Sequence, residues 1–209
     1  MTGKPSFWAR RVLPVLVEKG CRSRVILQER LRWIPRAHGD VVELGVGTGL
    51  NLAFYDANRV SRVTGVDPSP PLLAQAGVRA ARAPVEVELV EAPAEQLPFD
   101  AEAFDSAVMT YSLCSMADPA RALGELRRVL RPGGELIFVE HGLAPDAGTR
   151  WWQRRFTPVW RRFTGGCHLD RDVTSLLQGA GYRLGEISAG YSAGLRWLSF
   201  TYQGTARPA

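Results

Sequence analysis

Cysteine and histidine are scarce in this chain of 209 residues, which contains three of each. The cysteines, Cys21, Cys114 and Cys167, are odd in number and far apart, so they do not indicate a disulfide framework. Neither residue type shows the close spacing of a zinc site. The sequence therefore predicts reduced thiols and no metal centre.

Long apolar runs are also missing. No stretch approaches the roughly 18 to 20 apolar residues that a membrane-spanning helix needs, and residues 1–14 lack the apolar core of a signal peptide. We therefore expect a cytoplasmic protein. Hydrophobic residues make up 45% of the chain and charged residues 22%, which excludes a disordered, collagenous or coiled-coil chain. This length and composition predict a single domain over residues 1–209.

The positive charge of the chain is unevenly distributed. The formal net charge is +5, and residues 1–36 contain nine basic residues against two acids. A second cluster, residues 150–162, contains five arginines and no acid. Nucleic-acid binders usually carry a broader basic stripe together with groove-reading or stacking elements. Two local clusters therefore do not favour nucleic acid as a partner.

Short β-branched runs alternate with longer segments rich in alanine, leucine and arginine, which predicts a mainly parallel sheet covered by helices. The expected strands are residues 41–45, 62–67, 85–90, 104–110 and 135–141, followed by closing strands at 182–189 and 195–205. The expected helices are residues 50–55, 70–81, 119–130 and 170–180. Residues 132–134, Pro-Gly-Gly, are expected to stop the helix before them and turn the chain into the fifth strand.

A glycine-rich turn follows the first expected strand. Gly45, Gly47 and Gly49 let the backbone bend sharply and approach a ligand, and the segment after them offers free N–H groups to an anion. The second expected strand ends at Asp67, about 20 residues further on, where a carboxylate can accept both hydroxyls of a cofactor ribose. The third glycine comes one residue too early for the dinucleotide pattern G-x-G-x-x-G. This spacing disfavours a dinucleotide-dependent oxidoreductase but leaves it as an alternative.

The order of these motifs resembles the class I S-adenosylmethionine-dependent methyltransferases of the type 11 group. The pattern E-x-G-x-G-x-G is followed by Asp67, residues 94–99, the pair Phe104-Asp105 and residues 130–134. The resemblance implies S-adenosylmethionine as cofactor and S-adenosylhomocysteine as product. It also implies a doubly wound, Rossmann-like α/β fold with seven strands, mostly parallel, and an antiparallel C-terminal strand. The residues before the first strand are predicted to add an N-terminal helical cap. Residues 112–116, 139–141 and 158–171 resemble more narrowly the methyltransferase-like branch that includes the thiol methyltransferases of animals.

The resemblance further implies which residues bind the cofactor. They are Glu43, Gly45, Gly47, Gly49, Asn51, Asp67, Pro68, Ala94, Glu95, Thr110, Tyr111 and Ser112. The three glycines would shape the pocket for the methionyl part, Glu43 would hold its amino group, and residues 110–112 would pass beside the sulfonium. Pro68 would border the adenine and the backbone of Ala94 would meet its edge. Many relatives have an aspartate where this chain has Pro93, so adenine recognition here is expected to use backbone, water or Glu95.

The acceptor side is defined by fewer residues. A sulfonium is already an activated leaving group, so the protein must mainly hold the acceptor in line and exclude water. His141, at the end of the fifth expected strand, is the candidate catalytic base because histidine titrates near neutral pH; a histidine bonded to the following loop is the alternative. The candidate acceptor-pocket residues are Cys114, Trp152, Phe156 and Trp160. Cys114 is expected to be a buried filler and not a nucleophile.

Residues 151–163 are predicted to form an amphipathic helix. One face carries Trp152, Phe156, Val159, Trp160 and Phe163. The opposite face carries Arg154, Arg155, Arg161 and Arg162. Pro158 is expected to interrupt or kink the helix. Three interpretations stay open: a lid over an apolar acceptor, a contact with a membrane surface, and a helix packed on the core with solvated arginines.

The sequence therefore predicts a methyltransferase acting on a small or lipid-like apolar acceptor with a thiol, amine or oxygen nucleophile. A cofactor-binding or partner-binding module that has lost methyl transfer is the non-catalytic alternative. Within the single domain we expect a helical cap at residues 1–36, a cofactor-binding core at 37–141, and an acceptor-side segment with closing strands at 142–209. Peripheral contact with a membrane surface stays open as a further property.

Overall fold

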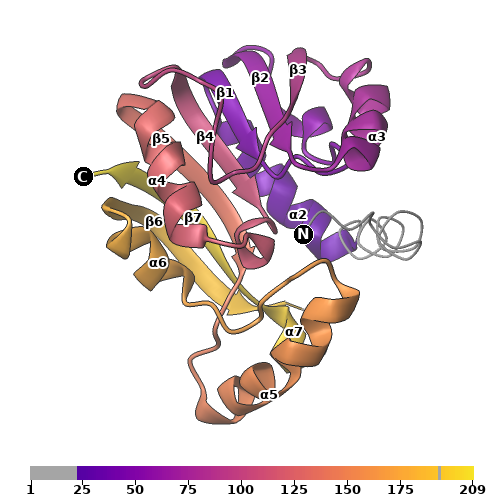
Figure 1. Cartoon of the computed structure of the whole chain (residues 1–209), viewed down its shortest axis with the longest axis vertical. Helices are drawn as coiled ribbons and strands as arrows, with labels where there is room; N and C mark the ends of the chain where they lie inside the picture. Colours follow the sequence, from indigo (N-terminus) through magenta and orange to yellow (C-terminus); the bar gives the residue numbers. More distant parts are fainter. Residues whose placement is uncertain (1–22, 193) are drawn as a thin grey trace.

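The computed structural model describes residues 23–192 and 194–209, and its centre is a sheet of seven strands in the order β3-β2-β1-β4-β5-β7-β6 (Figure 1). The strands that pair in parallel are β1 (Gly39–Leu44), β2 (Val60–Asp67), β3 (Glu86–Glu91), β4 (Phe104–Thr110) and β5 (Leu130–His141). β7 (Phe200–Pro208) runs antiparallel between β5 and β6 (Tyr182–Tyr191). The predicted Rossmann-like fold class is confirmed.

Helices cover both faces of this sheet (Figure 1). One face packs on α4 (Pro119–Val129) and α6 (Val173–Gly179), and the other on α2 (Arg24–Trp33), the short turns η2 (Ile34–Arg36) and η3 (Leu52–Phe54), and α3 (Pro70–Ala80). The remaining elements are η4 (Leu113–Ser115), α5 (Ala147–Phe163) and α7 (Arg196–Ser199). Of the expected N-terminal cap, residues 1–22 lie outside the described residues, and residues 24–36 form α2 and η2.

The central strands are buried on both faces, which explains their apolar composition. In β1, Val42 and Leu44 join the cluster under α4 and α6, whereas Val41 joins the cluster under α2 and α3. In β4, Met109 and Val108 divide in the same way, because successive strand side chains point to opposite faces. The parallel pairing brings the carboxyl ends of β1, β2 and β4 to one edge, where ligands bind in such sheets.

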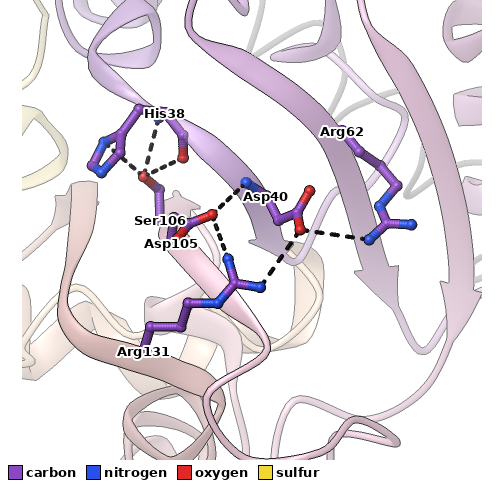
Figure 2. A network of polar contacts seen from close by, with 6 residues as sticks. All are labelled: His38, Asp40, Arg62, Asp105, Ser106 and Arg131. Atoms are coloured by element: carbon purple, nitrogen blue, oxygen red, sulfur yellow. Dashed lines mark hydrogen bonds and ion pairs between the residues drawn. The ribbon is translucent and has the colours of Figure 1, made fainter.

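A polar network ties the strands together at the opposite edge (Figure 2). The Oδ2 atom of Asp105 accepts from the backbone N–H of Asp40 at 2.8 Å and from Nη1 of Arg131 at 2.5 Å. Burial opposes ionisation of Asp105, but the Arg131 hydrogen bond holds the pKa of that carboxyl below its usual range. Arg131 and Arg62 also lie 3.7 Å from Asp40 Oδ2. This network helps to fix the register of β1 against β4, and it lies at the amino ends of these strands, far from the carboxyl edge.

Several local expectations were wrong. Residues 50–55 form only the turn η3 and not a longer helix, because the side chain of Asn51 is held by Glu43 and Thr110. Residues 132–134 do not precede β5 but bulge out within it, between the pairs Phe104–Leu130 and Ser106–Glu135. The last expected strand begins as α7, and pairing starts only at Phe200.

Pro158 does not interrupt α5, which continues from Ala147 to Phe163. Proline removes one N–H donor and crowds the carbonyl four residues earlier, here that of Arg154. Both Pro158 and Arg154 lie on the exposed side of the helix, where water can satisfy the freed carbonyl. The predicted interruption is therefore wrong, although the helix itself is present.

Candidate functional site

A cavity of about 590 Å³ opens at the carboxyl ends of β1, β2 and β4. Its walls come from the glycine-rich turn after β1, the loops after β2, β3 and β4, one residue of α2, and the segment after α5. Ten predicted cofactor-binding residues line it: Glu43, Gly45, Gly47, Asp67, Pro68, Ala94, Glu95, Thr110, Tyr111 and Ser112. Gly49 and Asn51 lie behind its wall. A volume of this size falls in the range of small-ligand sites.

The three glycines of the turn all have positive φ angles, but each serves a different contact. A Cβ on Gly45 would lie 2.4 Å from the Cβ of Ser112, so Gly45 lets the turn pack on the loop after β4. A Cβ on Gly49 would lie 2.8 Å from Leu52 Cδ1. At Gly47 the nearest atom would be 3.9 Å away, so the space beside this cavity-lining residue is left open for a ligand.

Asp67 lies directly beside this turn. Its Oδ2 accepts from the N–H of Gly47 at 3.0 Å, and its Oδ1 accepts from the N–H of Ser69 at 2.9 Å. The side chain is buried at the cavity wall, and desolvation raises its pKa despite these two hydrogen bonds. Each carboxylate oxygen keeps a further lone pair. Asp67 can therefore accept hydrogen bonds from a diol held in the cavity.

Glu43 is the buried acid at the end of β1. Its Oε1 accepts from Asn51 Nδ2 at 2.9 Å and its Oε2 accepts from the hydroxyl of Tyr55 at 2.7 Å. Desolvation raises the pKa of Glu43 to about 7, so the carboxyl is poised to ionise when a cation approaches. Asn51 thus does not face the cavity but positions Glu43.

Arg30, from α2, is the basic residue among those that line the cavity, and the sequence did not single it out. It is only 5% exposed, and its Nη1 donates to Oδ1 of Asn51 and, at 3.3 Å, to Oγ1 of Thr110. Its Nε has no hydrogen-bond partner among the described residues. A buried guanidinium at a cavity wall is suited to an anionic ligand group. No motif marks Arg30, because its role depends on where α2 packs.

The loop after β4 is organised by Glu140, a residue of the motif 139–141 whose role the sequence did not indicate. This fully buried carboxylate accepts from the N–H groups of Ser112 at 2.8 Å, Leu113 at 2.9 Å and Cys114 at 3.4 Å. Desolvation raises the pKa of Glu140 to about 7. The signal for this role was an acid directly after the apolar run of residues 136–139. Tyr111, in the same loop, has a φ of 53° and donates its hydroxyl to Glu29 of α2.

His141 lies at the end of β5, as expected, but it is not among the residues that line the cavity. Its ring packs edge-on against the ring of Tyr111 at 4.7 Å. The Nδ1 atom is enclosed and has no partner within the described ranges. Burial lowers the pKa of His141 to about 4, so the ring is neutral at neutral pH. Its role as a base stays a prediction.

The four candidate acceptor-pocket residues also lie outside the cavity wall. Cys114 is buried against Cys167 and Leu169, and a hydrogen bond with the Cys167 thiol, together with burial, raises the pKa of Cys114. The neutral thiol therefore acts as apolar filling. Trp152 and Phe156 are exposed, whereas Trp160 is half-buried. The cavity wall next to η4 and the end of α5 is formed instead by Ser115, Met116, Ala117, Thr164 and Gly165.

The methyltransferase-domain family matches residues 42–138, which hold the turn, Asp67 and the loop after β4. Strand order and cavity agree with this match, so the matched segment is a methyltransferase domain with the class I fold. A chain from the complex between the Haloferax volcanii Trm112 methyltransferase activator and the putative methyltransferase has the same fold. Its TM-score is 0.70 at 20% identity, over 95% of this chain and 98% of that one.

Two relatives indicate which kinds of methyltransferase this chain resembles. The thiol S-methyltransferase TMT1B of Homo sapiens is 37% identical over 161 residues, 74% of this chain and 65% of that protein. The phosphatidylethanolamine N-methyltransferase of Cereibacter sphaeroides is 40% identical over 112 residues, 53% of this chain and 54% of that protein. The chain therefore spans less than two thirds of either relative's length.

Proposed function

We propose that the protein transfers the methyl group of S-adenosylmethionine to a small, apolar thiol. The observation that carries the cofactor part of this proposal is the hydrogen bond from the N–H of Gly47 to Asp67. It places a carboxylate that can accept hydrogen bonds from the ribose hydroxyls beside the open space at Gly47. The residues present fit the cofactor. Asp67 would hold the ribose hydroxyls, Glu43 the methionyl ammonium and Arg30 the methionyl carboxylate, while the wall of Pro68 and residues 92–94 would enclose the adenine.

When bound, S-adenosylmethionine supplies a methyl carbon on a positively charged sulfur, so the chain's own residues need mainly to orient and desolvate the acceptor. Tyr111 and Ser112 form the wall beside Thr110, and Met116 supplies apolar surface. The acceptor sulfur forms a bond to this carbon as the carbon–sulfonium bond breaks. The thiol proton leaves to solvent. These residues therefore bind and position, and none is required to form a covalent bond.

A thiol is the acceptor that this cavity suits best. A cysteine-type thiol has a pKa of about 8.5 and a lysine-type amine a pKa of about 10.4, so a thiol with a pKa near the cysteine value is ionised to a useful fraction near neutral pH, whereas the amine remains protonated. Among the described residues that line the cavity there is no histidine to act as a base. The similarity to a thiol S-methyltransferase supports the same choice, and the amine and oxygen acceptors remain alternatives to be compared in the assay.

The test is methyl transfer by the purified full chain from methyl-labelled S-adenosylmethionine to an aliphatic thiol, to phosphatidylethanolamine and to a quinol. We expect labelled thioether as the main product. We expect about a hundredfold or larger loss of transfer in Asp67→Ala, because the ribose contact is lost. Labelled amine or ether without thioether would overturn the thiol assignment.

Two further outcomes would decide between the remaining alternatives. Thermal stabilisation by S-adenosylhomocysteine with no transfer to any acceptor would indicate a binding module without catalysis. Stabilisation by NADH alone would favour a dinucleotide-dependent oxidoreductase, which the glycine spacing disfavours.

A further inference from the structure

The burial of α5 is the reverse of what its composition suggests. The side of α5 that packs on the protein carries Thr149, Gln153 and Thr157, which are 7%, 1% and 4% exposed. Trp151 and Val159 are more than half exposed, at 58% and 54%. The usual pattern of an amphipathic helix places its apolar stripe against the core. Here three polar side chains face inward, and of the aromatic side chains of α5 only Trp160 packs on the core.

The exposed apolar side chains form one continuous surface with α7. Trp152 stacks on Phe156 at 5.3 Å, and Phe156 stacks on Trp197 of α7 at 5.1 Å. Trp151 contacts Trp152 edge-on at 4.6 Å. Leu195, just before α7, is 61% exposed. We call Trp151, Trp152, Phe156, Val159, Leu195 and Trp197 the aromatic face. In Figure 1, α5 and α7 lie side by side at one end of the molecule.

The charge around the aromatic face has a single sign. α5 contains five arginines, and residues 147–169 contain no acid. None of these arginines forms an ion pair with a described residue. Arg150, Arg154 and Arg155, together with Ala147 and Trp151, border an open surface hollow of about 640 Å³. Guanidinium groups at such a hollow are suited to phosphate oxygens, which they bind in a bidentate manner.

The C-terminal end of α5 leads into the wall of the cavity. Thr164 and Gly165, the residues directly after α5, line the cavity. None of the helices in the described ranges is long and apolar enough to cross a membrane. A helix that carries exposed tryptophans beside unpaired arginines has the chemistry of one that lies in the plane of a lipid surface. Its aromatic rings enter the acyl boundary while its arginines reach phosphate head groups.

We propose that the aromatic face and the adjoining arginines of α5 dock on an anionic phospholipid surface, with the cavity mouth beside the membrane. Charge complementarity favours an anionic surface, because the five arginines of α5 attract phosphate groups. A second copy of the chain would instead bring five more arginines against the first five. An anionic bilayer supplies both an apolar layer and phosphates in the same plane. The docking does not depend on methyl transfer, but it would deliver membrane-dissolved apolar acceptors to the cavity.

The test is sedimentation of the full chain with vesicles of equimolar phosphatidylglycerol and phosphatidylcholine, compared with vesicles of phosphatidylcholine alone. We expect binding to the anionic vesicles with a blue shift of tryptophan fluorescence, and weak binding to the neutral ones. Trp151→Ser/Val159→Ser and Arg155→Glu/Arg162→Glu are each expected to weaken binding about tenfold or more.

The control positions lie on and just after α3, far from α5 (Figure 1). Val78→Ser replaces a valine of α3 that is 62% exposed, and Arg82→Glu replaces an exposed arginine after α3. Both are expected to bind vesicles as the unaltered chain does. Calorimetry with S-adenosylhomocysteine is expected to give unchanged affinity in all four variants, which separates this proposal from the proposed function.

Three results would overturn the docking proposal. They are the absence of binding to anionic vesicles, equal losses in the α5 and the α3 variants, and a dimer in light scattering that Trp151→Ser/Val159→Ser converts to a monomer. The last result would assign the aromatic face to a second copy of the chain.

Discussion

At the scale of single residues, Arg30 completes a site whose other parts belong to recognisable motifs. Its guanidinium contacts Asn51 and Thr110, and its Nε is unused among the described residues. The same Asn51 holds Glu43. The Asn51 amide therefore holds the Glu43 carboxyl and the Arg30 guanidinium side by side. This pair matches a ligand that carries both an ammonium and a carboxylate. The glycines and Asp67 were predictable from spacing, but Arg30 was not, because its position depends on the packing of α2.

Arg30→Ala is expected to weaken S-adenosylhomocysteine binding by about 2 kcal/mol, because a charged hydrogen bond to the methionyl carboxylate is lost. Binding of 5′-methylthioadenosine, which has no methionyl carboxylate, is expected to change little. Calorimetry with both ligands measures the difference. Asp67→Ala serves as the contrasting variant, since loss of the ribose contact weakens both ligands. Equal losses for the two ligands in Arg30→Ala would assign Arg30 a structural role through Asn51 and Thr110.

At the scale of secondary-structure elements, α5 shows the limit of periodicity. The 3.6-residue pattern correctly predicts a helix with an aromatic and a basic face. It does not predict which side is buried, because a third side, with Thr149, Gln153 and Thr157, carries the contacts to the protein. Gln153 explains the choice. Its Oε1 accepts from the N–H of Ala144 at 2.9 Å and its Nε2 donates to the carbonyl of Gly142 at 3.0 Å.

Gln153→Leu is expected to lower the free energy of unfolding by about 2 kcal/mol, because two buried backbone groups lose their partners. Urea unfolding measures this change. Gln75→Leu is the matched control, since Gln75 is exposed on α3 and makes only a 3.5 Å contact with the carbonyl of Pro71. It is expected to change stability by less than about 0.5 kcal/mol. Equal stability of the two variants would show that Gln153 does not anchor α5.

At the scale of the whole molecule, the fold was predictable because each central strand is a short apolar run with a turn after it. β4 was predicted with its observed bounds, and β2 and β6 within two residues at each end. The errors lie where tertiary contacts override local pattern. Asn51 is bound by Glu43 and Thr110 instead of continuing a helix, and Trp197 stacks on Phe156 where a strand was expected. Neither contact has a signal in the neighbouring residues.

Burying Glu43 and Glu140 at the carboxyl edge also sets how the stability of the whole molecule depends on pH. Desolvation raises the pKa of each from 4.5 to about 7. Between these values the unfolded chain releases protons that the folded chain keeps, so the free energy of unfolding falls as pH rises. The loss from each group reaches at most about 3 kcal/mol and levels off above pH 7. Carboxyls with lowered pKa values, such as Asp105 and Asp172, act in the opposite sense at lower pH.

Glu140→Gln is therefore expected to flatten the fall in stability between about pH 5 and pH 7. The amide oxygen can still accept from the N–H groups of Ser112 and Leu113, so the loop after β4 keeps its main contacts. Urea unfolding across this pH range measures the slope. Glu91→Gln, at an exposed glutamate that ends β3, is expected to leave the slope unchanged. A Glu140→Gln slope equal to that of the unaltered chain would mean that Glu140 is ionised in the folded protein throughout this range, so that its three N–H contacts outweigh its desolvation.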